Sequence, residues 1–268
     1  MYEAERRYFG ELAGDRAGGG GDRPALVFLH GLTYDRRQWG PVLRELAVVD
    51  PGRRTLVVDL PGHGGSPRRD SYRPAEVAEV VHGAVTAAGL DAPVLVGHSL
   101  GGVLATCYAA TYPARGVVNV DQPLLVGGFA AVLRRMEPVL RGPDWRDVWN
   151  TMLGGMRIEE LPPSARELVR TATTPRPDLL LGYWDEVLSR PAEELAAERT
   201  AELATIRSRG LAYRYVTGAE PDPAYRSWLE TNLPEVTITV LPGSGHFPHL
   251  AHPDALARLL AGPSNGSA

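Results

Sequence analysis

A short apolar run that ends in a glycine-flanked serine restricts the possible folds of this chain more than any other segment. Residues 94–102 read Val-Leu-Val-Gly-His-Ser-Leu-Gly-Gly, and a helical pattern follows them. A strand that turns sharply into a helix forces Ser99 into a strained backbone conformation, and glycines at positions 97 and 101 avoid collisions with neighbouring backbone. Such a turn holds the Ser99 hydroxyl at the carboxyl edge of a parallel sheet, where α/β proteins form ligand sites, beside a helix N-terminus that favours negative charge.

The rest of the chain repeats the strand–helix order around this turn. Short runs rich in Val and Leu predict strands at residues 25–29, 55–59, 93–97, 117–121, 211–218 and 236–241. Helical patterns follow at residues 39–48, 74–89, 100–112, 224–233 and 253–260. Because the apolar residues of these strands are nearly continuous rather than alternating, the strands suit a sheet that is buried on both faces. The order predicts an α/β fold with a doubly wound, mostly parallel sheet.

The alternation stops between residues 123 and 209. This stretch predicts four or five helices, separated by Gly and Pro and rich in Trp and Met. We interpret it as a helical cap inserted after the strand that ends at Asp121, with residues 1–122 and 210–268 forming the core. A helical subdomain that only packs its own core is the alternative.

Composition excludes several classes of chemistry. The chain has 28 Lys+Arg residues against 32 Asp+Glu, a net charge of −4, and every basic residue is arginine. The lack of lysine excludes Schiff-base chemistry and a phosphate-binding P-loop. The net negative charge does not favour binding to nucleic acid or to an anionic membrane. The single cysteine, Cys107, excludes an internal disulfide and a multi-thiolate metal site. With no signal-peptide pattern at the start of the chain, we expect a cytoplasmic protein without a cofactor.

The turn at residues 97–101 resembles the nucleophile turn of the α/β-hydrolase family, and the resemblance extends over nearly the whole chain. Three further segments resemble the family's oxyanion loop, glycine-rich turn and catalytic-histidine loop, in the family's order: residues 29–32, 59–66 and 243–248. The resemblance implies an α/β-hydrolase fold with Ser99 as the nucleophile. It also implies that the N–H groups of Leu32 and Leu100 form the oxyanion hole.

The resemblance makes His246 the expected general base, because this histidine follows the last predicted strand. His246, His249 and His252 also have the spacing H-x-x-H-x-x-H, which is compatible with a metal site. Pro248 and Pro253 interrupt the helix that such a site would need, so we expect no metal.

The acid that orients His246 is left open between two positions. The family usually places it after the strand that ends near Gly218, where this chain has Glu220 and, one residue beyond the usual spacing, Asp222. Alternatively, Asp121 ends an apolar strand, where a carboxylate requires a partner. The cofactor-free dioxygenases of this fold use that variant position. We favour Asp121 over Asp222, with Glu220 as a third candidate.

The resemblance implies acyl transfer to water through an acyl-enzyme intermediate. An apolar cap suits a small or medium hydrophobic carboxylic ester, lactone or thioester. Residues expected to bind the substrate come from the turn, the oxyanion loop and the cap: His30, Gly31, His98, Trp145, Trp149 and Trp184. A cofactor-free oxygenase and a non-catalytic ligand-binding protein on a hydrolase scaffold are the alternatives. We expect a small-molecule substrate as partner, no nucleic acid or membrane, and a monomer or homodimer.

Overall fold

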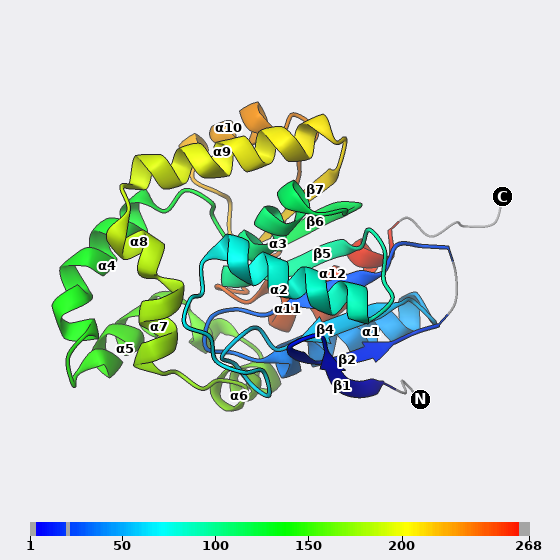
Figure 1. The fold of residues 1–268 in the computed structure, drawn as a ribbon, viewed down its shortest axis with the longest axis horizontal. Coiled ribbons are helices and arrows are strands. Elements are labelled where there is room, and N and C mark those ends of the chain that lie inside the picture. The colour runs from blue at the N-terminus through cyan, green and yellow to red at the C-terminus, as the bar shows by residue number, and fades with distance from the viewer. Residues whose placement is uncertain (1–3, 20–21, 263–268) are drawn as a thin grey trace.

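An eight-stranded sheet forms the centre of the protein in the computed structural model, which describes residues 4–19 and 22–262 (Figure 1). The strands in chain order are β1 (Glu5–Phe9), β2 (Leu12–Ala17), β3 (Leu26–Leu29), β4 (Thr55–Val58), β5 (Val94–His98), β6 (Gly116–Val120), β7 (Ala212–Thr217) and β8 (Thr237–Val240). They lie in the order β1-β2-β4-β3-β5-β6-β7-β8. All pairs from β4 to β8 are parallel, whereas β1 and β2 are antiparallel additions at one edge. The predicted doubly wound, mostly parallel sheet is confirmed.

The hairpin of β1 and β2 is absent from the strands that the sequence predicts. β1 reads Glu-Arg-Arg-Tyr-Phe and is exposed except at its last residue, so it lacks the continuous apolar run of the central strands. Phe9 and Leu12 lie on either side of the hairpin turn, are fully buried and anchor the pair. An edge strand with one open side tolerates charged side chains, which is why apolar patterning missed this one.

Helices cover both faces of the sheet. The core helices are α1 (Gly40–Val49), α2 (Pro74–Ala87), α3 (Leu100–Thr111), α10 (Pro223–Asn232), α11 (Pro248–Ala251) and α12 (Pro253–Ala261). Successive side chains of a strand point to opposite faces, so the neighbours Leu95 and Val96 of β5 enter two different clusters of buried side chains. α1 and α12 pack against each other over the Val96 cluster, and α2 and α3 pack together over the Leu95 cluster.

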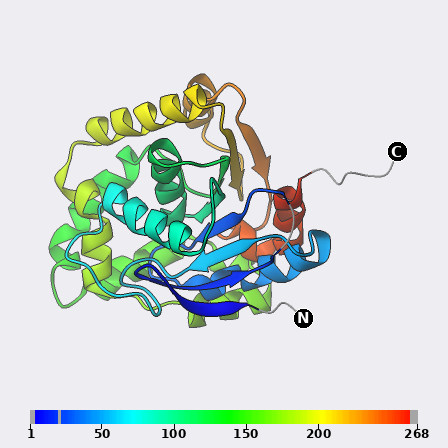
Figure 2. The same cartoon turned by 45° about the vertical axis from the view of Figure 1, so that its right-hand side comes forward.

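Six helices fill the chain between β6 and β7. They are α4 (Gly127–Leu140), α5 (Trp145–Gly155), α6 (Pro163–Thr171), α7 (Pro177–Tyr183), α8 (Asp185–Ser189) and α9 (Ala192–Ser208). Figures 1 and 2 show α4, α5, α7 and α8 gathered at one end of the molecule, with α12 at the opposite end. The stretch holds one α-helix more than the four or five predicted, because the chain breaks at Trp184 and α8 restarts with Asp185 and Glu186, which suit a helix N-terminus.

The end of α6 is tied to the loop that follows β3. The N–H of Thr174 donates to the Thr33 carbonyl at 2.7 Å, and the Thr33 and Thr173 hydroxyls share a hydrogen bond of 2.9 Å. Arg37 donates to the carbonyl of Thr171 at 2.8 Å. The inserted helices therefore contact the core at a segment next to Leu32. Among the described residues, no helix combines the length and the apolarity needed to cross a bilayer.

Candidate active site

Ser99 lies in the turn between β5 and α3, with a backbone φ of 51° that favours glycine but is here occupied by serine. A Cβ atom at Gly97 would lie 2.0 Å from the carbonyl oxygen of Gly101, and one at Gly101 would lie 2.3 Å from the carbonyl oxygen of Leu29. Any larger residue at either position would therefore push the backbone apart. The two glycines allow the chain to bend tightly enough to present the Ser99 side chain at the end of β5.

Asp121 and His246 form a hydrogen-bonded pair close to this turn. Nδ1–H of His246 donates to a carboxylate oxygen of Asp121 at 2.8 Å, and the other oxygen accepts from the Thr217 hydroxyl at 2.8 Å and the Gly218 N–H at 3.1 Å. Burial alone would raise the pKa of Asp121, but the hydrogen bonds and the charge of His246 outweigh burial and lower it. The carboxylate is thus held ionised and fixes one ring orientation of the histidine.

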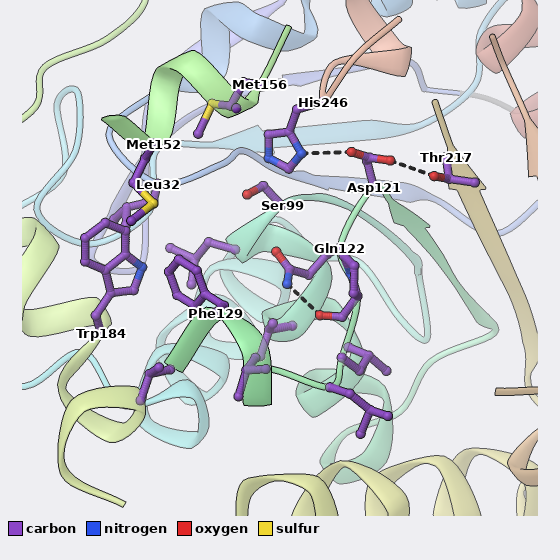
Figure 3. A pocket seen from close by; sticks show the side chains of 18 of the residues that line it. Leu32, Ser99, Asp121, Gln122, Phe129, Met152, Met156, Trp184, Thr217 and His246 are labelled. Carbon is purple, nitrogen blue, oxygen red and sulfur yellow. Dashed lines mark hydrogen bonds and ion pairs between the residues drawn. The ribbon is translucent and has the colours of Figure 1, made fainter. Parts of the chain in front are cut away.

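Ser99 and His246 line the same pocket, and in Figure 3 the Ser99 side chain points toward the histidine ring. Because Nδ1 of His246 is engaged by Asp121, Nε2 is the ring atom left to face a nucleophile. The Ser99 hydroxyl makes no hydrogen bond with any residue that the structure describes. Hydrogen bonds between a nucleophile and its general base are often long without substrate and shorten only in the substrate complex.

The two expected oxyanion donors come from the ends of β3 and β5. Leu100 is the first residue of α3, so its N–H has no partner within the helix. Gly31 brings the other loop against the turn, since a Cβ atom at Gly31 would lie 3.3 Å from Cβ of Ser99. The loop that contains Leu32 is fixed at the following residue, because the N–H of Thr33 donates a hydrogen bond to Nε2 of His63 at 3.0 Å.

Asp222, the other candidate acid, has a different set of partners. Its carboxylate accepts from the N–H groups of Ala224 and Tyr225 at 2.9 and 3.2 Å and caps α10. Glu220 pairs with Arg226 at 2.5 Å. Asp222 and Glu220 both line the pocket, but the structure gives the hydrogen bond to His246 only to Asp121 among the three candidates.

The pocket above Ser99 has a volume of about 710 Å³ and is predominantly apolar. Its apolar lining comes from the core and from the inserted helices: Leu32, Leu100, Val103, Leu124, Phe129, Trp149, Met152, Met156 and Trp184, among others. Figure 3 shows Phe129, Met152 and Trp184 facing Ser99 and His246 across this space. Two of the three tryptophans predicted to bind substrate are therefore in the lining.

Four residues that the sequence suggested for substrate binding do not line this pocket. They are His30, Gly31, His98 and Trp145. His30 is fully buried and accepts the Leu60 N–H at 2.9 Å, so its side chain joins two loops beneath the site. Trp145 is packed at the start of α5 with Arg146 over its ring, and Gly31 contacts the turn only through its backbone. None of the four contributes to the lining of this pocket, so their part in substrate binding stays a prediction.

His98 makes a contact that the sequence does not predict. Its Nε2–H donates to the backbone carbonyl of His246 at 2.8 Å, which ties the serine turn to the histidine loop. Of the other two histidines in the H-x-x-H-x-x-H spacing, His249 is fully buried against the His98 and Trp39 rings, and His252 donates to the Pro242 carbonyl at 2.8 Å. The three histidines thus have three separate environments.

Buried neutral histidines make the fold sensitive to acid. Burial is the main cause in each case and lowers the pKa of four of them: His30, His63, His98 and His249, the last to about 3. In the unfolded chain these histidines accept protons below about pH 6.5, whereas in the folded protein they resist protonation. The contribution of these histidines to the free energy of unfolding is therefore fully present above that pH. It decreases as the pH falls below it, by about 1.4 kcal/mol per pH unit for each histidine that stays neutral.

We expect the melting temperature, followed by circular dichroism, to fall steeply between about pH 6.5 and about pH 5. His249→Phe should make this decrease shallower, whereas the matched substitution His252→Gln, at a half-exposed position, should leave its slope unchanged. A melting temperature that stays constant over this range would contradict the assignment of these histidines as neutral in the folded state.

Comparisons with known proteins concern the family and the fold of the chain. A family model described as the alpha/beta hydrolase family matches residues 26–259. The pimeloyl-(acyl-carrier protein) methyl ester esterase of Nitrosospira multiformis is 27% identical over 262 aligned residues, which cover 87% of this chain and 92% of that protein. The sn-1-specific diacylglycerol lipase ABHD11 of Mus musculus is 26% identical, with 89% of this chain and 81% of that protein covered.

A solved structure similar in fold is that of an AqdC variant in complex with its substrate, in a study of recognition and ring cleavage of the Pseudomonas quinolone signal. It superposes with a TM-score of 0.77 at 19% identity, covering 97% of this chain and 98% of that one. At this identity the likeness concerns the arrangement of strands and helices.

Proposed function

Because the chain belongs to the alpha/beta hydrolase family, we propose that it hydrolyses a carboxylic ester with Ser99 as nucleophile, His246 as general base and Asp121 as the orienting acid. The observation that carries this proposal is the 2.8 Å hydrogen bond between His246 and Asp121 in the pocket that contains Ser99. Two relatives that match most of the chain are named as an esterase and a lipase, which supports ester hydrolysis as the reaction class.

The first step is the attack of the Ser99 oxygen on the ester carbonyl. Nε2 of His246 takes the hydroxyl proton, and Asp121 keeps Nδ1 protonated and stabilises the imidazolium that forms. The N–H groups of Leu32 and Leu100 stabilise the oxyanion, and each such donor contributes about 3–4 kcal/mol in comparable sites. His246 then returns the proton to the leaving alcohol.

The second step releases the acyl group. Water enters in place of the alcohol, loses a proton to Nε2 of His246 and attacks the acyl-enzyme carbonyl. Collapse of the second tetrahedral intermediate breaks the bond to the Ser99 oxygen, which regains its proton from His246. The products are a carboxylic acid and an alcohol, or a thiol from a thioester, and the enzyme returns to its starting state.

The apolar lining supports a small or medium hydrophobic ester, lactone or thioester as substrate. We infer that residues 123–209 act as a cap over residues 1–122 and 210–268, because Trp149, Met152 and Trp184 all come from this insertion and line the pocket. A subdomain that only packed its own core would not need to direct these side chains toward Ser99.

Covalent labelling tests the nucleophile directly. A fluorophosphonate probe is expected to label the wild-type protein and to leave Ser99→Ala unlabelled, because the probe reacts only with a serine activated by a base. Intact-mass spectrometry measures the adduct, and Ser227→Ala, which removes an exposed serine of α10, should label like wild type. Labelling of Ser99→Ala would contradict the proposal.

A cofactor-free oxygenase is the second candidate. It is favoured by the position of the acid, since Asp121 follows β6 rather than β7 and this is the variant position that such oxygenases share. An oxygenase would consume oxygen with a heteroaromatic substrate and would keep this activity in Ser99→Ala. A ligand-binding protein would instead retain its ligand without turnover.

A further inference from the structure

A buried arginine forms part of the pocket wall away from Ser99. Arg199 lies on α9, is only 5% exposed and belongs to the pocket lining together with Leu195 and Val187. Its Nη2 pairs with Glu198 at 2.6 Å and Glu202 at 3.0 Å. Its Nε and Nη1 make no hydrogen bond with any described residue. The guanidinium therefore keeps hydrogen-bond donors free at the wall of an apolar pocket, where an acceptor on a bound molecule can use them.

The pocket extends from Ser99 toward this arginine along α3. Val103 lines the pocket one helical turn beyond Ser99, an axial rise of about 6 Å, and α9 packs beside α3. Arg209 at the end of α9 donates to the Ala109 carbonyl near the end of α3 at 3.0 Å, so the two helices run in the same direction. Helices that pack side by side have axes about 8–10 Å apart, so Arg199 and Ser99 face the same pocket from neighbouring elements.

The charge around Arg199 is already balanced. Glu198 also accepts from Arg190 at 2.8 Å, and Glu186, which lines the pocket, lies 3.3 Å from the same Arg190. Burial raises the pKa of Glu202 to about 7, although the charge of Arg199 acts in the opposite direction. Burial at this site therefore already disfavours the ionised form of Glu202. A further carboxylate would meet the same desolvation and three neighbouring acids. An uncharged acceptor would use the free donors without adding charge.

We propose that Arg199 forms a distal subsite for an uncharged carbonyl oxygen, of a ketone, amide or second ester, carried by the substrate beyond an apolar segment. The inference rests on the proposed hydrolysis at Ser99 and narrows its substrate class. One end of the substrate places its scissile carbonyl between Ser99 and the oxyanion donors. The apolar segment crosses the lining of Val103 and Leu195, and the second carbonyl accepts from Arg199.

Binding to the Ser99→Ala variant tests the subsite without turnover. Three methyl esters of equal chain length are compared by calorimetry, ending in a methyl ketone, in the isosteric isopropyl group and in a carboxylate, each over a series of lengths. At the best length the methyl ester that ends in a ketone is expected to bind about ten- to a hundred-fold more tightly than the methyl ester that ends in an isopropyl group. This is the usual contribution of a hydrogen bond to a charged donor. Equal affinities, or tightest binding of the carboxylate, would overturn the proposal.

Substitutions in the Ser99→Ala background assign the preference to Arg199. Arg199→Met is expected to abolish the ketone preference. Because this change leaves Glu202 without its arginine, Arg199→Met/Glu202→Gln serves as the variant with less uncompensated charge. Circular dichroism checks that both variants are folded. Arg190→Met removes a cation from the same cluster without altering the pocket lining and should keep the preference. A preference that survives in folded Arg199 variants would overturn the assignment.

The proposed function and the subsite fail in different ways. Wild-type turnover of the methyl ester that ends in an isopropyl group reports only on Ser99, His246 and Asp121. This compound has no second acceptor for Arg199 to bind. If all three esters bind with equal affinity and are hydrolysed with equal efficiency, the subsite proposal is contradicted and the proposed hydrolase function stands. If the ketone-terminated ester binds selectively but no ester is hydrolysed, the proposed hydrolase function is contradicted and binding of a carbonyl oxygen at Arg199 stands.

Discussion

Substitution of Ser99 by alanine is expected to lower kcat for ester hydrolysis about a million-fold. Without the hydroxyl no acyl-enzyme forms, and water held near the oxyanion donors provides only the residual rate. The measurement is a single-turnover or long-time assay with p-nitrophenyl esters of varied chain length. KM should change little, because the pocket walls that hold the substrate are untouched. The size of the effect distinguishes a nucleophile from a residue that only shapes the turn.

The variant should fold normally, since alanine meets the same backbone requirement at a φ of 51° as serine does. Ser227→Ala is the control for loss of a serine outside the pocket and should retain wild-type kcat. A decrease below about a hundred-fold would exclude Ser99 as the nucleophile, because removal of a triad nucleophile costs far more. Oxygen consumption that persists in Ser99→Ala would instead favour the oxygenase.

The central sheet could be predicted because its strands carry the signal in their own residues. β3, β4, β5 and β6 are buried on both faces, so each is a predominantly apolar run that can be recognised without knowledge of its partners. The edge strand β1 has no such signal. Its place depends on pairing with β2 and on the burial of Phe9 alone, which are properties of the folded chain.

The serine turn could be predicted for the same reason, since Gly97, Ser99 and Gly101 lie within five residues and their steric requirement is local. The contact of His98 with the His246 carbonyl joins residues 148 positions apart and has no local signature. Arg199 was equally hidden, because its helix has charged residues on several sides and only packing on α3 shows which one enters the pocket.

The ambiguity between Asp121 and Asp222 has a physical origin. β6 and β7 are neighbours, so their carboxyl ends both reach the pocket and either acid is near enough for consideration. One local signal separates them. Asp222 is followed by Pro223, and Asp before Pro is the usual start of a helix, where the carboxylate caps the first N–H groups. Asp121 has no helix to cap, which leaves its oxygens for other partners.

The substitution Asp121→Asn is expected to lower kcat about ten-thousand-fold, whereas Asp222→Asn should leave it near the wild-type value. An amide at position 121 favours the wrong tautomer of His246 and cannot stabilise the imidazolium. At position 222 asparagine caps a helix as well as aspartate does, so α10 should keep its stability. Steady-state kinetics with one ester, and thermal melts of both variants, measure these effects.

The two substitutions form a matched pair, because each removes one negative charge from the lining of the same pocket and each keeps the side-chain shape. A general electrostatic effect on the site would lower kcat in both variants. Of the two carboxylates, only that of Asp121 accepts a hydrogen bond from Nδ1 of His246, so a large difference in kcat points to that bond. The reverse order, with the larger loss in Asp222→Asn, would require Asp222 to leave the N-terminus of α10 and approach His246, and would move the orienting acid from β6 to β7.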